Sequence, residues 1–184
     1  GHLTCVSASR ETIDEVIDTY RDKGVNQIVA LRGDVPAEVE GGPASGVHPS
    51  GYETAAELVA GVRNRADADE IYIFVAAYPE VHPKAASASA DMDNLKRKID
   101  AGADRAITQF FFDADVYLRF LERARASGIN APIVPGIMPV TSFAGICRFS
   151  KACGTTVPTW MHELFTGLDD APEIRELVAA TVAA

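Results

Sequence analysis

The sequence predicts an α/β fold with a parallel sheet, and among such folds it favours an incomplete (β/α)8 TIM barrel. Three times an amphipathic helix stops at a glycine and a buried strand begins a few residues later, at Gly24, Gly102 and Gly128. Glycine is typical of this position because the residue just past a helix often adopts the left-handed conformation. Helices and strands that alternate in this way form parallel sheets.

The strands and helices follow from the apolar pattern. The run from Ile71 to Val75 has the length and the β-branched and aromatic content of a buried strand. Including this one, we expect five strands, at residues 2–6, 27–32, 71–77, 105–112 and 132–137. We expect helices at residues 10–23, 54–65, 87–101, 114–127, 141–153, 158–165 and 170–183. Residues 34–51 are rich in Gly, Pro, Ser and Glu and predict a long loop.

A barrel is favoured over a doubly wound nucleotide-binding sheet. Neither glycine-rich phosphate loop, G-x-G-x-x-G or G-x-x-x-x-G-K-[ST], occurs in the sequence. Polar residues instead follow several strand ends, where barrels carry their sites; they are Thr4, Arg32, Asp34, Tyr78, His82 and Gln109. A whole barrel has eight strands and about 250 residues. We therefore expect residues 1–184 to be the central part of a single domain and a fragment of a longer protein.

Composition limits the function further. A formal net charge of −9 argues against a nucleic-acid-binding protein, because such binding depends on clustered Lys and Arg. No apolar run approaches the roughly 20 residues that cross a bilayer, and the first residues lack signal-peptide features, so we expect no membrane association and a cytoplasmic protein. Cys5, Cys147 and Cys153 show no metal-binding spacing, which predicts reduced thiols and no metal.

The segment after the third expected strand has the features of a binding loop. Residues 76–83 read Ala-Ala-Tyr-Pro-Glu-Val-His-Pro. The two prolines restrict the backbone, so Tyr78 and His82 project from a stiff loop, which suits a cofactor or substrate site. The run Lys96-Arg97-Lys98 offers positive charge to an anionic ligand, although it also suits a solvated helix face.

Four strings carry a resemblance to a known family. They are Ala30-Leu31-Arg32-Gly33-Asp34, the loop at 76–83, the pattern D-x-x-N-L-K-R-K-x-D-A-G-A at 91–103, and I-T-Q-F-F-F-D at 107–113. In this order they resemble methylenetetrahydrofolate reductase of the bacterial type. The similarity runs over nearly the whole chain, through P-G-I-M-P-V at 135–140 to G-L-D-D at 167–170.

The resemblance implies a flavoprotein barrel, here about strands 3 to 7 with their helices. Such an enzyme takes a hydride from NAD(P)H onto FAD and passes it to 5,10-methylenetetrahydrofolate, which gives 5-methyltetrahydrofolate for methionine synthesis. It also implies a homo-oligomer for the full-length protein. By the same resemblance FAD is lined by His2, Arg32, Gly33, Asp34, Ala55, Tyr78, His82, Ala85, Asp91, Asn94, Arg97 and Lys98. Asp34 and Gln109 are the implied catalytic residues, and Asp34, Gln109 and Phe149 the implied substrate contacts.

One expected helix has the right polarity for such a site. Asp91, Asn94 and Lys98 are spaced i, i+3 and i+7, which places an acceptor, an amide and a cation on one stripe. Met92 and Leu95 belong to the adjoining apolar stripe, so the helix packs inward and still shows a polar edge. The alternative for Asp91 and Asn94 is an exposed helix surface.

Asp34 and Gln109 have physical reasons to act. A carboxylate at Asp34 beside the flavin disfavours the negative charge gained on reduction, which lowers the reduction potential; the structural alternative is that Asp34 only begins the following turn. Gln109 lies in an otherwise apolar strand, where an unpaired amide is costly, so it either contacts a ligand or is a satisfied core glutamine. Phe149 is equally compatible with the core.

Some features depart from the family pattern. Gly145 stands where some members carry a folate-contacting glutamine. The family's general acid is a glutamate on the first barrel strand, which we expect to precede this chain. We also expect the isolated chain to expose two sheet edges, to associate and to bind FAD poorly.

Two rival functions stay open. A FAD barrel of the proline dehydrogenase type keeps the fold and the cofactor and changes the substrate. A non-catalytic barrel paralogue keeps only the fold. A Schiff-base aldolase is disfavoured because no expected strand carries an interior lysine.

Overall fold

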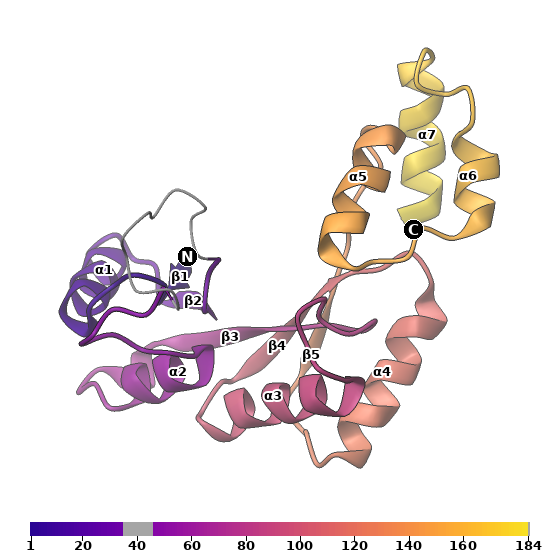
Figure 1. Cartoon of the computed structure of the whole chain (residues 1–184). Helices are drawn as coiled ribbons and strands as arrows, with labels where there is room; N and C mark the ends of the chain where they lie inside the picture. The colour runs from indigo at the N-terminus through magenta and orange to yellow at the C-terminus, as the bar shows by residue number, and fades with distance from the viewer. Residues whose placement is uncertain (35–45, 184) are drawn as a thin grey trace. The chain divides into compact units, whose positions relative to one another are not determined.

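A computed structural model describes residues 1–34 and 46–183 (Figure 1). Five strands form one sheet in the order β1-β2-β3-β4-β5, in which β1 pairs with β2, and β2 with β3, in parallel. The strands are β1 (His2–Thr4), β2 (Gln27–Leu31), β3 (Tyr72–Ala77), β4 (Arg105–Phe110) and β5 (Ile133–Gly136). Each expected strand is present, and its ends agree with the prediction to within two residues.

The helices also follow the predicted pattern. They are α1 (Arg10–Asp22), α2 (Ala55–Arg63), α3 (Ala88–Asp100), α4 (Ala114–Ala126), α5 (Phe143–Cys153), α6 (Thr159–Phe165) and α7 (Pro172–Ala183). The short 3-10 helix η1 (Ala68–Glu70) was not expected. Of the long loop predicted at 34–51, residues 35–45 lie outside the described residues.

Local signals explain the helix boundaries. The helices α1 to α5 begin with a capping side chain that accepts a hydrogen bond from a backbone N–H of the first turn; the caps are Ser9, Thr54, Ser87, Asp113 and Ser142. The three glycines at which we placed helix ends all have positive φ. The helix, glycine and strand unit predicted from the sequence is therefore confirmed.

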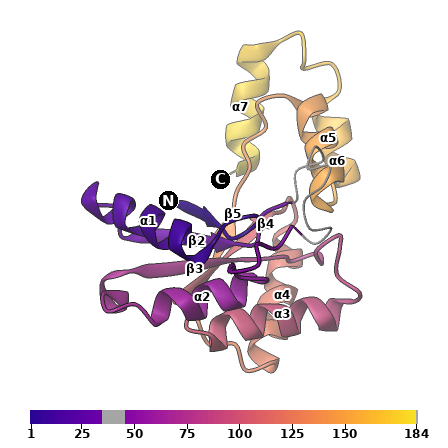
Figure 2. The same cartoon turned by 60° about the vertical axis from the view of Figure 1, so that its left-hand side comes forward.

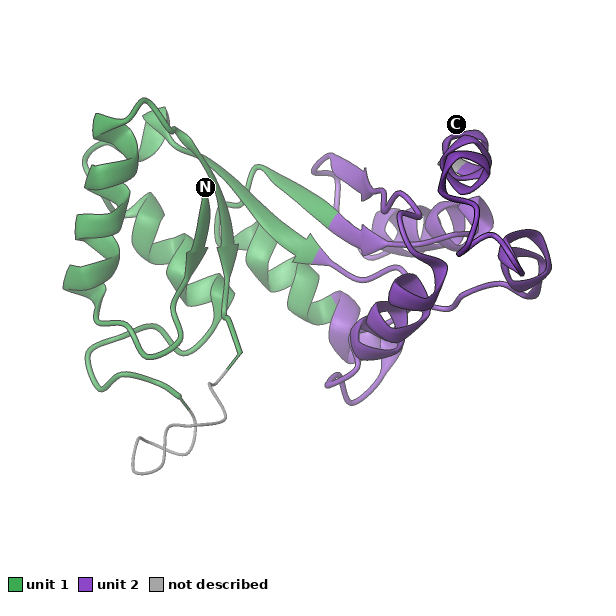
Figure 3. Cartoon of the chain, turned by 90° about the horizontal axis from the view of Figure 1, so that it is seen from above, with its two compact units in different colours: residues 1–76, 93–107 green, residues 77–92, 108–184 purple. Residues whose placement is uncertain are grey.

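The chain divides into two compact units (Figure 3). Unit 1 contains residues 1–76 and 93–107, and unit 2 contains residues 77–92 and 108–184. In unit 1 alternate strand residues are buried, for example Ile28 and Ala30 in β2, which α2 contacts. The residues between them are less buried, so each strand has one covered and one more open face.

Unit 2 has a second core at its carboxyl end. There α5, α6 and α7 lie side by side (Figures 1 and 2) around a cluster of buried side chains. The cluster contains Val140, Phe143, Ile146, Met161, Phe165 and Ala179. The rings of Phe143 and Phe165 stack with centroids 5.2 Å apart. Apolar and aromatic packing thus fixes α5, which carries Phe149.

Candidate cofactor and substrate site

The predicted site residues fall into both units. Unit 1 holds eight of them, which are His2, Arg32, Gly33, Asp34, Ala55, Asn94, Arg97 and Lys98. Unit 2 holds six, which are Tyr78, His82, Ala85, Asp91, Gln109 and Phe149. Each unit brings some of its own residues together.

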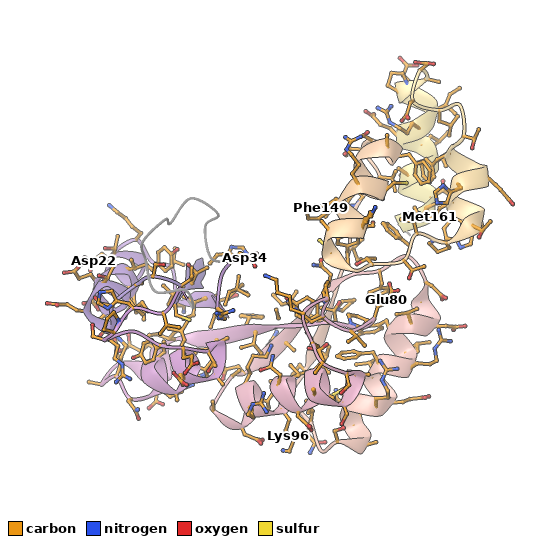
Figure 4. All side chains as sticks on the ribbon, in the orientation of Figure 1. Asp22, Asp34, Glu80, Lys96, Phe149 and Met161 are labelled. Carbon is orange, nitrogen blue, oxygen red and sulfur yellow. The ribbon has the colours of Figure 1, made fainter. Side chains whose placement is uncertain are left out.

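In unit 1 the segment after β2 exposes two opposite charges in succession. Gly33 has a φ of 85°, and a Cβ at this position would lie 2.6 Å from Cγ1 of Val6. Only glycine allows the backbone at position 33 to come this close to Val6. The backbone N–H of Val6 donates a hydrogen bond to the carbonyl of Arg32 over 2.8 Å, which holds the two segments together. The side chains of Arg32 and Asp34 are exposed, Asp34 at the end of the described segment (Figure 4).

Lys98 places a buried cation at the carboxyl end of β3. Its side chain is only 5% exposed, and its ammonium donates to the carbonyl oxygen of Ala76 over 2.5 Å. This contact fixes the ammonium at the strand end, where barrels carry their sites. Because β2 and β3 are parallel, Lys98 and the segment 32–34 lie at the same edge of the unit 1 sheet.

The helix α3 has the two stripes that its sequence predicts. Met92 and Leu95 are buried, and so are Asp91 and Lys98 on the polar stripe. Asn94 is half-buried, and its side-chain oxygen lies 3.4 Å from a guanidinium nitrogen of the exposed Arg97.

The basic run on α3 is divided between two environments. Lys96 forms an i,i+4 ion pair with Asp100 on the solvated face of the helix (Figure 4). Lys98, two residues on, is buried. The solvated-face interpretation therefore holds for Lys96 and fails for Lys98.

His2 and Ala55 do not lie at the carboxyl end of a strand. His2 is exposed in β1, where it pairs with Val29, and its carbonyl accepts a hydrogen bond from the Tyr20 hydroxyl over 2.8 Å. It therefore lies farther from the carboxyl end of the strand than Thr4 does. Ala55 is the half-buried first residue of α2.

In unit 2 the loop after β3 brings Tyr78 and His82 together. Their rings meet edge to face with centroids 4.5 Å apart. Nδ1 of His82 accepts a hydrogen bond from the backbone N–H of Lys84 over 3.0 Å. In the neutral ring the proton is then on Nε2, which makes Nε2 a donor for a ligand. Ala85 donates its N–H to the carbonyl of His82 over 2.9 Å.

Asp91 anchors this loop. One of its carboxylate oxygens accepts from the backbone N–H of His82 over 2.9 Å, and the side chain is 9% exposed. The exposed-surface alternative is therefore wrong for Asp91. The structure gives this residue a loop-holding contact that its helix position alone did not predict.

Gln109 and Phe149 both contact Phe110 of β4, the first at its backbone and the second at its ring. The side-chain oxygen of Gln109 accepts from the backbone N–H of Phe110 over 3.1 Å, so its amide NH2 remains as the donor for a ligand. Phe149 is 48% exposed and stacks on the buried Phe110 with centroids 5.6 Å apart (Figure 4). An exposed ring on a rigid base is a suitable platform for a flat substrate. Gly145 lies one turn earlier on α5.

Sequence reasoning missed two residues that hold the loop. A carboxylate oxygen of Glu80 accepts from the backbone N–H of Thr156 over 2.9 Å. The guanidinium of Arg123 donates to the carbonyl of Pro79 over 3.0 Å. The partners are 76 and 44 residues apart in the chain, and no local sequence signal marks such contacts.

Three further observations limit the chemistry. Burial raises the pKa of the Cys5 and Cys153 thiols, which disfavours their reactive thiolate forms. Among residues 1–34 and 46–183 no group of three His, Cys, Asp or Glu side chains is placed to hold a metal ion. No helix in this described part is long and apolar enough to span a bilayer.

A parallel sheet that alternates with helices and has polar residues at the carboxyl ends of its strands is typical of a (β/α)-barrel protein. The chain belongs to the methylenetetrahydrofolate reductase family, whose model matches residues 1–184. This confirms the resemblance, and the structure is a partial barrel of that family.

Similar proteins from bacteria and a plant carry the same family name. The chain is 51% identical over 182 residues to 5,10-methylenetetrahydrofolate reductase of Pectobacterium carotovorum and 48% identical to that of Escherichia coli, and it covers 57% of each. It is 38% identical to methylenetetrahydrofolate reductase (NADH) 1 of Arabidopsis thaliana, of which it covers 31%. In each case 97 to 99% of this chain is matched. The chain thus spans little more than half the length of its bacterial relatives.

A solved structure is similar in fold. It is an uncharacterized protein from Clostridium thermocellum, described as binding two copies of 5-methyl-5,6,7,8-tetrahydrofolic acid. The match has a TM-score of 0.61 and 16% sequence identity, and it covers 98% of this chain and 57% of the other.

Proposed function

We propose that the protein containing this chain reduces 5,10-methylenetetrahydrofolate to 5-methyltetrahydrofolate, with NAD(P)H as the hydride donor and FAD as the cofactor. The observation that carries the proposal is the family match over residues 1–184. The product supplies methyl groups for methionine synthesis. We further propose that the protein is a cytoplasmic homo-oligomer.

The donors in the chain fit a dinucleotide. Lys98 is a buried cation at a strand end, His82 offers Nε2, and Arg32 and Arg97 are exposed guanidiniums that suit a diphosphate. Gly33 keeps the backbone close to the strand end, where a side chain would block approach. These residues would hold FAD, together with His2, Ala55, Tyr78, Ala85, Asp91 and Asn94. Bound FAD supplies the hydride chemistry.

The protein groups position the substrates and tune the cofactor. We infer that Asp34 places negative charge near the flavin and so lowers its reduction potential. The amide of Gln109 orients the nicotinamide or the folate by hydrogen bonding, and the exposed ring of Phe149 stacks against the substrate. Where relatives carry a glutamine, Gly145 leaves one folate contact to another group.

Purified full-length protein tests the proposal directly. We expect a flavin absorption band, NAD(P)H oxidation with an artificial acceptor, and oxidation by methylenetetrahydrofolate in a second half-reaction. Rates with NADH and NADPH determine the preferred donor, and light scattering determines the oligomeric state. A flavin band with turnover of proline and a quinone, but none of the folate, would indicate the proline dehydrogenase type. Absence of flavin would indicate a non-catalytic paralogue.

A further inference from the structure

We propose that Glu80 is a positioning residue for the cofactor site, because its carboxylate ties the loop at 78–83 to the segment after α5 and thereby aims the imidazole of His82. The inference deepens the proposed FAD-dependent function and rests on it. All of the contacts that carry it lie within unit 2.

The loop contains a strained residue. Val81 has a φ of 89°, a backbone conformation that is unfavourable for a β-branched side chain. Such strain persists only where the surrounding structure holds it, and it is common at functional sites. Val81 directly precedes His82, so its backbone angle sets the direction in which the imidazole projects.

Contacts on both sides of Val81 hold it in place. On one side Glu80 accepts from the N–H of Thr156 over 2.9 Å. On the other side the N–H of His82 donates to the buried carboxylate of Asp91 over 2.9 Å. If the Glu80 contact is lost, the loop can relax at Val81 toward an ordinary negative φ, which turns His82 away from its present direction.

The segment after α5 is shaped to receive the loop. A Cβ at Gly154 would lie 2.7 Å from Cγ of Pro83, so the absence of a side chain there permits the contact. The cavity between the loop and this segment has a volume of about 10 Å³, which leaves room for about one water molecule. The Glu80 contact therefore joins two closely packed surfaces.

The same segment reaches the aromatic platform. The buried hydroxyl of Thr155 donates to the carbonyl of Phe110 over 3.2 Å, and Phe149 stacks on the ring of Phe110. Residues 154–156 thus contact both the loop that carries Tyr78 and His82 and the strand that carries Gln109. Glu80 links the groups proposed for the cofactor to those proposed for the second substrate.

The first test compares three variants of the full-length protein by the dissociation constant of FAD. Glu80→Ala removes the acceptor, and we expect binding to weaken about five- to tenfold. Glu80→Gln keeps an oxygen that accepts from Thr156, and we expect binding within about twofold of wild type. Glu122→Ala removes an exposed glutamate on α4 and is the matched control.

The second test adds Val81→Gly. Glycine adopts a positive φ without strain, so the loop no longer needs Glu80 to hold it. We expect the double variant Glu80→Ala/Val81→Gly to lose less FAD-binding free energy than the two single variants lose together. Amide hydrogen exchange in the flavin-free protein should show faster exchange at Thr156 and His82 in Glu80→Ala than in Glu80→Gln.

These outcomes separate the two proposals. Wild-type protein without flavin would overturn the proposed function. A flavin-binding wild type with unchanged FAD affinity in Glu80→Ala, or with strictly additive effects of the two substitutions, would overturn the role of Glu80 alone. If Glu80→Ala does not fold, Glu80→Asp, which retracts the carboxylate by one methylene, provides the same comparison.

Discussion

The two ends of the unit 1 strands carry charge in different ways. At the amino ends of β3 and β4, Arg63 bonds to the carbonyls of Gly102, Ala68 and Ile71 and pairs with Asp104. At the carboxyl ends, Arg32 and Asp34 are exposed and the ammonium of Lys98 meets a carbonyl.

Two further arginines form ion pairs near η1. Arg65 contacts the carboxylates of Asp14, Asp18 and Asp67, and Arg21 bridges Asp67 to Glu70. These charges are matched by protein partners, so they stabilise the fold and offer little to a ligand. The difference teaches that charge alone does not mark a candidate site: Arg63 and Arg65 are largely covered, whereas Arg32 and Asp34 are exposed. It agrees with the division of barrels into a stabilising end and a catalytic end.

The largest expected effect is at Arg63. Arg63→Met leaves the carboxylate of Asp104 with only the backbone N–H of Ile73, among the described residues, as a donor and removes the side-chain donor of three carbonyls, and we expect a loss of about 3 kcal/mol in the free energy of unfolding. Urea denaturation of the full-length protein measures it. Arg119→Met, on the exposed face of α4, is the control and should change stability by less than about 0.5 kcal/mol. Equal losses in the two variants would contradict a special role for Arg63.

Lys98 should affect the cofactor as well as the fold. Lys98→Met removes a buried cation and its bond to the carbonyl of Ala76, so we expect a loss of about 1 kcal/mol in the free energy of unfolding, which is smaller than at Arg63. FAD affinity should fall about tenfold or more, because a charge-assisted hydrogen bond to the cofactor is lost. Lys96→Met on the solvated face of the same helix should leave FAD binding unchanged. A fall in stability without a change in FAD affinity would mean that Lys98 stabilises the fold and does not bind the cofactor.

Asp34 tests whether an exposed carboxylate at the strand end tunes the cofactor. Asp34→Asn removes one negative charge, and we expect the flavin potential to rise by on the order of 30 mV, which is about 1.4 kcal/mol for two electrons. Folate turnover should slow as a result. Asp22→Asn, at the far end of α1 (Figure 4), is the matched control. A potentiometric titration without any shift would remove this role.

The positions of the elements and of Lys98 were accessible from the sequence because they depend on local periodicity. The 3.6-residue period of α3 already separates the Lys96 face from the Lys98 face. Glycine at position 33 indicates a close approach of the backbone; the structure shows that approach toward Val6, and the expected approach to a flavin ring stays a prediction. Each of these inferences uses residues within a few positions of one another.

Contacts between distant segments were not accessible. Arg63 pairs with Asp104 across 41 positions, and Glu80 meets Thr156 across 76. Their signals are single charged residues that look like any solvated surface charge. The positive φ of Val81 was also hidden, because valine rarely adopts that conformation and only tertiary contacts maintain it.

The smallest expected effect concerns the pH dependence of the ion pairs near η1. Two hydrogen bonds from Arg65, at 2.9 and 3.1 Å, hold the pKa of the Asp67 carboxyl below its usual range. The folded-state pKa of Asp67 is lower than its unfolded value of about 3.9. The stabilisation is therefore complete above roughly pH 5, and it is lost as the pH falls from there through the unfolded and then the folded pKa. Asp67→Asn should therefore destabilise the protein at pH 7 by about 1 kcal/mol or less, and by a smaller amount at pH 3.

Urea unfolding at the two pH values measures this difference, with Asp69→Asn on the exposed side of η1 as the control. The informative quantity is the change, between pH 7 and pH 3, in the stability difference between each variant and the wild type. A loss for Asp67→Asn that is the same at both pH values would mean that Asp67 acts through packing. The contribution of Asp67 to stability would then not depend on its charge. The variants of Lys98 and Asp34 would remain as the tests of the difference between the two strand ends.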